Sequence, residues 1–204
     1  MGLYRTLIVP HLVRLAMRKA ALVPYRRRLI ARATGRVLEI GIGSGLNLPF
    51  YSSGVTHVVG LEPSPKLLGF AKRESSSTPG QPELLEGSAE AIPLDDRSID
   101  TVVTTWTLCT IPDVRRALQE ARRVLKPDGR LLFVEHGRSA DAAVRRWQDR
   151  LDPVWTTIAG GCHLNRPIAE LIAGSGFTIQ QLDTGYGEGP KMMAFMYEGV
   201  AAPR

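Results

Sequence analysis

The sequence predicts an α/β domain built on a mostly parallel sheet. From Gly35 onward, short apolar runs typical of strands alternate with stretches in which apolar residues recur at helical spacing. The first of these runs ends in a cluster of glycines, where a strand would turn into a helix. With 204 residues, 44% of them hydrophobic and 23% charged, the chain is long enough for one domain with a full core. We therefore predict a domain over residues 35–204, preceded by an arm over residues 1–34.

The arm is strongly basic. Residues 1–36 hold nine of the 26 Lys and Arg residues and no acidic residue, whereas acidic residues outnumber basic ones in the rest of the chain. We predict an amphipathic helix between Pro10 and Pro24. Its mostly apolar face is formed by Leu12, Leu15, Ala16, Lys19 and Leu22. Such a helix can cover the site of the adjoining domain as a lid or lie on an anionic membrane. Because apolar residues interrupt the charges and no RNA- or DNA-binding motif follows, we expect no nucleic-acid partner.

The first half of the domain is predicted to contain four strands and one helix. Short apolar, β-branched runs bounded by Gly, Pro or charged residues are typical of buried strands in a parallel sheet. The predicted strands are Arg36–Ile40, His57–Glu62, Glu83–Glu86 and Asp100–Thr105. A helix opens at Pro65 and runs to about residue 74, since proline is favoured in the first turn.

The next helix has clear signals at both ends. Asp113 can cap its first turn. Apolar residues then recur at spacings of three and four, at Ala117, Leu118, Ala121, Val124 and Leu125. Pro127 and Gly129 are expected to end the helix before a fifth strand over Arg130–Glu135.

The C-terminal third is predicted to hold two further helices and two strands. A tryptophan-containing helix covers about Ala140–Leu151 and is followed by a loop over Asp152–Asn165. A second helix runs over about Arg166–Ser175. Two closing strands, Thr178–Asp183 and Met192–Glu198, complete the sheet.

Cysteine usage and hydropathy restrict the cellular setting. Cys109 and Cys162 are far apart in the sequence, so we expect neither a disulfide framework nor a Cys-rich zinc site, and no bound metal. No uncharged run reaches the roughly 18–20 residues of a membrane-spanning helix. The apolar stretch Leu7–Val13 is short and is followed by basic residues, unlike a signal peptide. These features predict a cytoplasmic protein, with peripheral contact to the inner face of the membrane if residues 1–34 lie on a lipid surface.

The strongest local motif is the glycine cluster Glu39-Ile-Gly-Ile-Gly-Ser-Gly45. Glycines allow backbone to approach a ligand closely and to adopt torsions that a Cβ would forbid. The spacing is G-x-G-x-G, with Leu46 where the fingerprint of nicotinamide-dinucleotide enzymes has its third glycine, which disfavours a dehydrogenase. Glu62 ends the second strand 21 positions after Gly41, where a carboxylate can accept both hydroxyls of an adenosine ribose.

Two further motifs follow in order, Gly87-Ser-Ala-Glu-Ala-Ile-Pro-Leu94 and Arg123-Val-Leu-Lys-Pro-Asp-Gly-Arg-Leu-Leu132. Together with the glycine cluster, Glu62 and Asp100, they make residues 35–199 resemble the class I S-adenosylmethionine (SAM)-dependent methyltransferases. The resemblance implies a Rossmann-like fold with a seven-stranded, mostly parallel sheet and helices on both faces. It also implies SAM (S-adenosyl-L-methionine) as cofactor and S-adenosyl-L-homocysteine as product.

Motifs in the second half of the chain narrow the resemblance to one family of methyltransferases. Thr105–Pro112, Val134–His136 and parts of Trp147–Asn165 are similar to the methyltransferase-like family that contains membrane-associated thiol S-methyltransferases, including short bacterial forms. This similarity implies a small thiol acceptor such as hydrogen sulfide or methanethiol.

Carried over to this chain, the resemblance implies a set of residues around the cofactor. Those expected at its methionine and ribose parts are Glu39, Gly41, Gly43, Gly45 and Glu62. Those expected at the adenine are Pro63, Ser88, Ala89 and Glu90, and those at the methionine end and the acceptor are Thr105 and Trp106. Ser88 departs from the pattern, since many class I enzymes have an aspartate there that accepts from the adenine amino group.

Methyl transfer to sulfur needs a thiolate, because a free thiol has a pKa of about 8.5. An imidazole near the acceptor would favour the deprotonated form. The candidates are His136, at the carboxyl end of the fifth strand, and His163, with Asp152 able to orient either one. Two alternatives remain open: a phosphatidylethanolamine-type phospholipid N-methyltransferase held at a membrane by the arm, and a SAM-binding module without activity.

Overall fold

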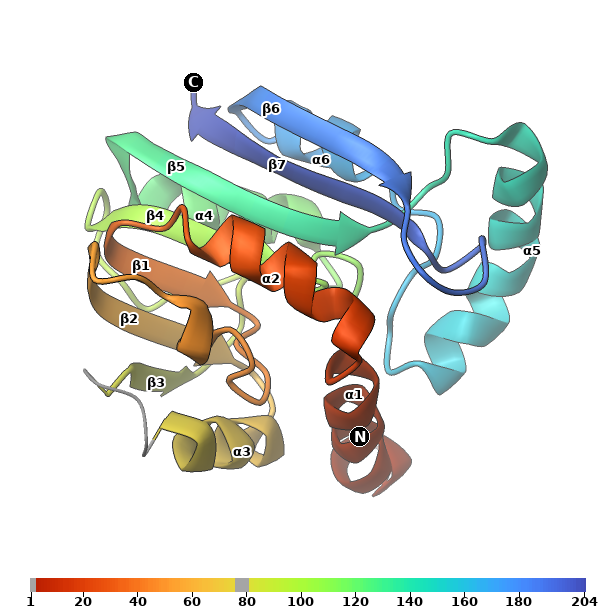
Figure 1. Cartoon of the computed structure of the whole chain (residues 1–204), viewed down its shortest axis with the longest axis horizontal. Helices are drawn as coiled ribbons and strands as arrows, with labels where there is room; N and C mark the ends of the chain where they lie inside the picture. Colours follow the sequence, from red (N-terminus) through yellow and green to blue (C-terminus); the bar gives the residue numbers. More distant parts are fainter. Residues whose placement is uncertain (1–2, 76–80) are drawn as a thin grey trace.

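A computed structural model describes residues 3–75 and 81–204 and contains a seven-stranded sheet. The strands are β1 (Gly35–Ile40), β2 (Val55–Glu62), β3 (Glu83–Glu86), β4 (Ile99–Thr105), β5 (Leu125–His136), β6 (Phe177–Tyr186) and β7 (Phe195–Pro203). They lie in the order β3-β2-β1-β4-β5-β7-β6 (Figure 1). The first five strands are parallel and β7 is antiparallel to both of its neighbours, which confirms the predicted Rossmann-like architecture.

The strand order reverses between β1 and β4, which lie side by side although β2 and β3 separate them in the sequence. In open α/β sheets, ligands bind outside the carboxyl ends of the strands at such a switch point. The glycine cluster follows β1 at this edge, Glu62 ends β2, and Trp106 follows β4. The topology therefore gathers the main predicted cofactor residues at one edge of the sheet.

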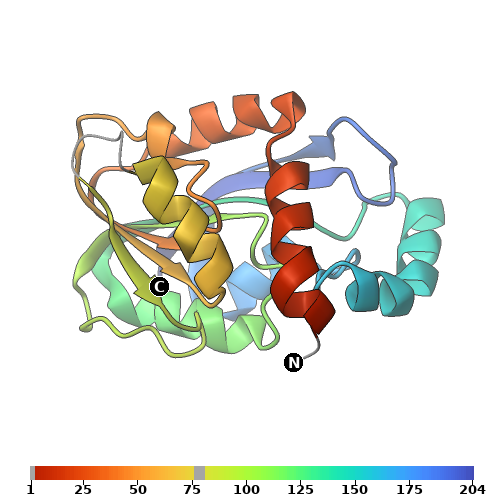
Figure 2. The same ribbon diagram turned by 90° about the horizontal axis from the view of Figure 1, so that it is seen from below.

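Helices cover both faces of the sheet. The helices are α1 (Val9–Met17), α2 (Val23–Ile30), α3 (Pro65–Ser75), α4 (Val114–Val124), α5 (Ala142–Ile158) and α6 (Ile168–Gly174), with short helical turns at Tyr4–Ile8, Ala20–Leu22 and Leu48–Phe50. α4 and α6 pack on one face and α2 on the other, while α5 lies beyond the carboxyl ends of the strands (Figures 1 and 2). Consecutive residues of β1 belong to the cores on opposite faces of the sheet. Leu38 lies in the core beside α4, and Val37 lies in the core beside α2. Within the described part of the chain, no helix has the length and apolar character needed to cross a membrane.

The helix predicted after Asp113 is confirmed and ends at Val124, before Pro127, but the predicted start of the next strand at Arg130 is wrong. Asp113 caps α4, with Oδ1 accepting from the backbone N–H of Arg116 at 3.0 Å. The expected turn at Pro127–Gly129 lies within β5, which begins directly after α4. Pairing with β4 skips from Leu125 to Arg130, so the proline, which has no N–H to donate, falls in the unpaired part of the strand.

The loop predicted from Asp152 is helical in its first part. α5 continues through Pro153 to Ile158. A proline inside a helix removes one backbone hydrogen bond, and here the helix accommodates that loss instead of ending.

The last strand was expected over Met192–Glu198, and this expectation is wrong in its bounds. β7 begins at Phe195 and extends to Pro203, which pairs with Phe177 at the start of β6. The strand is longer at its C-terminal end because β6 offers it a partner along its length, and no local sequence pattern specifies that pairing.

The arm contains two main helices where the sequence predicted one. Pro10 and Pro24 lie in the first turns of α1 and α2, and the chain between them bends at Lys19, which has extended torsions (φ −57°, ψ 135°). Proline lacks an N–H and is tolerated in a first turn, so each proline starts a helix. α2 belongs to the core, since Leu29 and Ile30 are fully buried. Packing is therefore continuous across the predicted boundary at residue 34.

Candidate cofactor and acceptor site

The glycine cluster forms a tight turn after β1. Gly41 has a φ of +69°, and a Cβ there would lie 2.4 Å from Cγ2 of Thr107 in the segment after β4. Gly45 has a φ of +80°, and a Cβ there would lie 3.2 Å from Cα of Ala71 in α3. Both positions therefore require glycine, because the turn packs directly against two neighbouring segments.

Glu62 lies against this turn. Its Oε2 accepts from the backbone N–H of Gly43 at 3.1 Å, and its Oε1 from the N–H of Ser64 at 3.0 Å. The residue is 6% exposed, and burial raises its pKa to about 7 although both N–H groups act to lower it. The predicted ribose-binding carboxylate is thus in direct contact with the predicted glycine turn. A pair of ligand hydroxyls could donate to this carboxylate.

Glu39 is bonded on both carboxylate oxygens within the protein. Asn47 Nδ2 donates to Oε1 at 2.8 Å and the hydroxyl of Tyr51 donates to Oε2 at 2.7 Å. Asn47 also donates to Thr105 Oγ1 at 3.0 Å. Burial raises the pKa of Glu39 to about 7. Glu39 therefore ties the segment after the glycine turn to β1, and its contact with the cofactor stays a prediction.

The residues predicted for the adenine lie after β2 and β3. Pro63 is exposed, and Ala89 is buried. Ser88 donates to Glu90 Oε2 at 3.1 Å, while Glu90 Oε1 accepts from the backbone N–H of Asp113 at 2.6 Å. Glu90 thus joins this loop to the start of α4. Contact of these residues with adenine stays a prediction.

Trp106 follows β4 in a strained backbone conformation. Its φ is +50°, a value that is rare for a bulky residue. The backbone N–H of Trp106 donates to the carbonyl of Val134 at 2.8 Å. The guanidinium carbon of Arg26 lies 4.7 Å from the centroid of the Trp106 ring, and Tyr25 makes an edge contact with the ring at 6.3 Å. The second helix of the arm therefore reaches a predicted cofactor residue.

Glu135 holds the loop that follows Trp106. It is fully buried, and its two oxygens each accept a backbone N–H at 3.1 Å, one from Thr107 and one from Leu108. Burial raises its pKa to about 7, although the two N–H groups oppose the shift. Three buried glutamates, Glu39, Glu62 and Glu135, thus share a pKa that burial raises to about 7.

The two cysteines, which are 53 residues apart in the sequence, are in contact. Cys162 Sγ lies 3.6 Å from Cys109 Sγ and 3.1 Å from His136 Nε2, and both cysteines are free. The neighbouring Cys109 and burial raise the pKa of Cys162. Burial acts to lower the pKa of His136, but Cys162 and the Glu135 carboxylate outweigh it and the pKa is raised. The separation of the two cysteines in the sequence did not indicate their distance in space, because the loops after β4 and α5 meet at the end of β5.

Asp152 orients His163. Its Oδ2 lies 2.8 Å from His163 Nδ1, and its Oδ1 accepts from the backbone N–H of Leu164 at 2.7 Å. The backbone N–H of His163 donates to the carbonyl of Cys109 at 2.9 Å. Both predicted histidines therefore lie beside the cysteine pair, each with a different partner.

Sequence reasoning missed four polar residues of this region: Arg26, Asn47, Tyr51 and Glu135. The available signal for Glu135 was an acidic residue inside an otherwise apolar strand. Asn47 and Tyr51 follow the glycine cluster without a motif that marks them. Arg26 was counted only as part of the basic arm, yet it is 4% exposed and its Nε is buried with no hydrogen-bond partner among the described residues.

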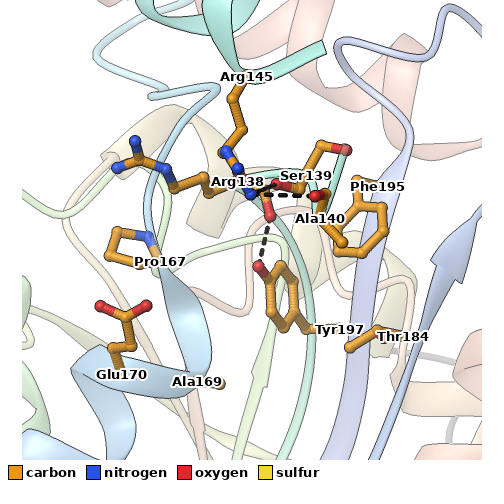
Figure 3. A pocket seen from close by; sticks show the side chains of 10 residues that line it. All are labelled: Arg138, Ser139, Ala140, Arg145, Pro167, Ala169, Glu170, Thr184, Phe195 and Tyr197. Atoms are coloured by element: carbon orange, nitrogen blue, oxygen red, sulfur yellow. Dashed lines mark hydrogen bonds between the residues drawn. The ribbon is translucent and has the colours of Figure 1, made fainter. Parts of the chain in front are cut away.

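A separate surface hollow of about 290 Å³ lies where the segment after β5 meets α6, β6 and β7 (Figure 3). Arg138, Arg145 and Glu170 contribute charged groups to its wall, and the Tyr197 hydroxyl donates to the carbonyl of Arg138. The residues predicted for the cofactor and for catalysis do not line this hollow. We therefore do not assign it to the reaction.

Comparison with known proteins agrees with this geometry. Residues 38–133 match a family described as "Methyltransferase domain". The thiol S-methyltransferase TMT1B of Rattus norvegicus is 35% identical over 151 residues, which are 72% of this chain and 62% of that protein. A phosphatidylethanolamine N-methyltransferase of Cereibacter sphaeroides is 34% identical over 116 residues, 54% of this chain and 57% of that protein. Among solved structures, a SAM-dependent methyltransferase of Methanosarcina mazei has a TM-score of 0.68 at 25% identity, covering 82% of this chain and 92% of that one.

The chain thus spans less than two thirds of the length of either curated relative. The family match runs from β1 to β5, the part that carries the glycine turn, Glu62 and Trp106. The strand order and the solved structure agree on the fold. Residues 38–133 therefore match a methyltransferase domain, the fold is the Rossmann-like fold of SAM-dependent methyltransferases, and the chain is similar to the thiol S-methyltransferases.

Proposed function

We propose that this protein transfers a methyl group from SAM to a small acceptor, and that the acceptor is a thiol. The observation that carries the proposal is the contact between Gly43 and Glu62 at the switch point of the sheet. A buried carboxylate fixed by two backbone N–H groups is suited to accept hydrogen bonds from a ribose diol. The glycine turn beside it lets a ligand approach the backbone closely.

Arg26 is suited to hold the carboxylate of the methionine part of SAM. Burial lowers its pKa to about 10, so its guanidinium is still charged at neutral pH. Its buried Nε has no hydrogen-bond partner among the described residues, and its side chain lies over Trp106. A buried cation with an unused donor favours an anionic ligand, because an unmade hydrogen bond to a charged group is costly.

The basic arm is suited to cover the site. Four of its basic side chains contact the body of the protein: Arg14 over Phe70, Arg18 with Glu74, Arg26 over Trp106 and Arg28 with Glu198. These contacts hold the arm against the body at four points, with Arg26 buried and Arg18 and Arg28 about half exposed, and α2 reaches Trp106. We infer that the arm serves the reaction as a lid over the cofactor.

The acceptor thiol would approach where β4 and β5 end. In the transfer, the bond between the sulfonium sulfur and the methyl carbon breaks as the bond from that carbon to the acceptor sulfur forms. The thiol proton leaves to a base, which a neutral imidazole can supply. His136 and the Asp152-oriented His163 both lie in this region. The similarity to thiol S-methyltransferases supports sulfur as the accepting atom.

A panel of acceptors tests this proposal. The full-length protein is incubated with SAM labelled in its methyl group and with hydrogen sulfide, methanethiol, a small amine or phosphatidylethanolamine vesicles, and products are identified by mass spectrometry. We expect label on sulfur with both thiols, and we expect His163→Gln to lower kcat more than it raises KM. Label only on amine or lipid would reject the thiol acceptor. SAM binding without any labelled product would favour a non-catalytic module.

A second candidate, phospholipid N-methylation, has one structural observation in its favour. Apolar side chains of the arm are exposed, among them Leu7 at 50%, Leu12 at 50% and Leu15 at 72%. One of the relatives is a phosphatidylethanolamine N-methyltransferase. If lipid is the acceptor, Leu12→Glu with Leu15→Glu should abolish both co-sedimentation with anionic vesicles and methylation of lipid. Leu182→Glu, at an exposed leucine of β6, is the matched control.

A further inference from the structure

Cys109, His136 and Cys162 bring three metal-ligand atoms into one compact group. The two Sγ atoms and one ring nitrogen of His136 all lie within 4.8 Å of one another, and Nε2 is the nitrogen that contacts Cys162. Cys109 is buried, and the other two residues are half-buried. The three residues come from the loop after β4, the end of β5 and the loop after α5. The tertiary fold, and no single turn, creates the group.

The separations are close to those of three ligands on one tetrahedral ion. With zinc–sulfur bonds of about 2.3 Å and zinc–nitrogen bonds of about 2.0–2.1 Å, two sulfurs lie about 3.8 Å apart and a sulfur and a nitrogen about 3.6 Å apart. The sulfurs of Cys109 and Cys162 are 3.6 Å apart, and Cys162 Sγ is 3.1 Å from His136 Nε2. To bind the ion, the distance between Cys162 Sγ and His136 Nε2 has to increase by roughly half an ångström. A disulfide would require the sulfurs to close to about 2.05 Å, which is a larger movement.

The donor set selects a thiophilic ion. Two thiolates and a neutral imidazole carry two negative charges, which one divalent cation balances. Thiolate sulfur and imidazole nitrogen suit zinc, whereas magnesium and calcium prefer carboxylate, carbonyl and water oxygens. The group therefore has the chemistry of a Cys₂His zinc site.

We propose that Cys109, His136 and Cys162 bind one thiophilic divalent metal ion of the zinc class. Binding forms two metal–sulfur bonds and one bond to Nε2, and the two thiol protons are released to solvent. Three protein ligands leave a fourth position open, as in catalytic zinc sites. Cys109 Sγ also lies 3.6 Å from the carbonyl of Trp106, so the group adjoins a residue predicted at the methionine end of the cofactor and the acceptor.

His136 limits the affinity expected of this site. Its Nδ1 is buried with no hydrogen-bond partner among the described residues. Metal-bound histidines usually donate their other N–H to a carboxylate or carbonyl, and loss of that support typically weakens binding by about 10- to 100-fold. We therefore expect an ion that chelators remove without unfolding the chain.

A thiol acceptor is a suitable ligand for the open position. It would lose its proton on binding and meet the methyl group of SAM as a thiolate, which makes His136 a ligand and leaves His163 as the base. This consequence rests on the proposed function, whereas the metal site does not.

The test is a metal titration of the full-length, untagged protein, reduced and stripped with a chelator. Cobalt(II) is the probe, because cobalt–thiolate charge-transfer absorption and tetrahedral d–d bands report sulfur ligation directly. We expect both signals to saturate at one equivalent of cobalt and to vanish when zinc displaces it. Cys162→Ser and His136→Gln should each weaken cobalt binding at least tenfold. His57→Gln, at a half-buried histidine on β2 paired with Glu83, should leave binding unchanged.

Several outcomes would overturn the site. The first is absence of the cobalt–thiolate charge-transfer band in the reduced protein. The second is a band that persists unchanged in Cys162→Ser while circular dichroism shows that the variant is folded. Because the titration contains neither SAM nor acceptor, its failure would leave methyl transfer untouched. Conversely, a metal-binding protein that methylates no thiol would reject only the proposed function.

Discussion

Glu62 should make SAM binding depend on pH. Its pKa is about 7 in the free protein, and only the ionised carboxylate can accept from both ribose hydroxyls while keeping its two backbone bonds. About one tenth of the protein is in this form at pH 6 and about nine tenths at pH 8. Because apparent affinity scales with the fraction of the competent form, Kd for SAM should fall about tenfold between these pH values.

Glu62→Gln tests this reasoning by calorimetric titration with SAM at both pH values. Glutamine keeps the size but loses the charge, so we expect Kd at pH 8 to rise about 10- to 100-fold and the pH dependence to disappear. Glu135→Gln is the matched control, since it removes another buried carboxyl whose pKa is also about 7 but whose partners are Thr107 and Leu108. A tenfold pH dependence that survives in Glu62→Gln would refute the assignment of Glu62 to the ribose.

Three further predictions concern stability. Gly41→Ala should lower the free energy of unfolding by about 1–3 kcal/mol, because the new Cβ meets Thr107 at a positive φ; an unchanged Tm would contradict this. Asp113→Ala removes the cap of α4 and should cost about 1 kcal/mol in urea unfolding, and a variant as stable as the parent would show that the cap contributes nothing. The buried glutamates titrate near 4.5 when unfolded and near 7 when folded, so the folded state binds more protons between these values. The free energy of unfolding should therefore fall as pH rises from about 4.5 to about 7, by up to about 1 kcal/mol per pH unit for each carboxyl, and a rise over that interval in urea titrations would contradict the shifts.

The fold was predictable because most of its elements are specified by local patterns. Buried parallel strands are short apolar runs, and Asp113 marks the start of α4 by its own side-chain chemistry. Errors arose where a distant partner decides the outcome. β7 extends to Pro203 because β6 pairs with it, and the turn at Pro127 is absorbed into β5 because β4 resumes pairing beyond it.

The residues of the site likewise fall into two groups, those placed by the sheet topology and those placed by the packing of distant segments. Gly43 follows β1 and Glu62 ends β2, the next strand of a parallel sheet, so their contact at one edge follows from topology. The contact of Cys109 with Cys162 depends on how two loops and an extended α5 pack together, and the burial of Arg26 depends on α2 joining the core. Neither leaves a signal in residue spacing.

Thiol methylation itself is tested most directly by a single-turnover reaction. The full-length protein is mixed with methyl-labelled SAM and methanethiol, and labelled dimethyl sulfide and S-adenosyl-L-homocysteine are quantified over time. We expect the two products to appear together in a 1:1 ratio, with both slowed in Glu62→Gln when SAM is below saturation. Formation of S-adenosyl-L-homocysteine without labelled sulfide, or no reaction at saturating SAM, would contradict a thiol methyltransferase.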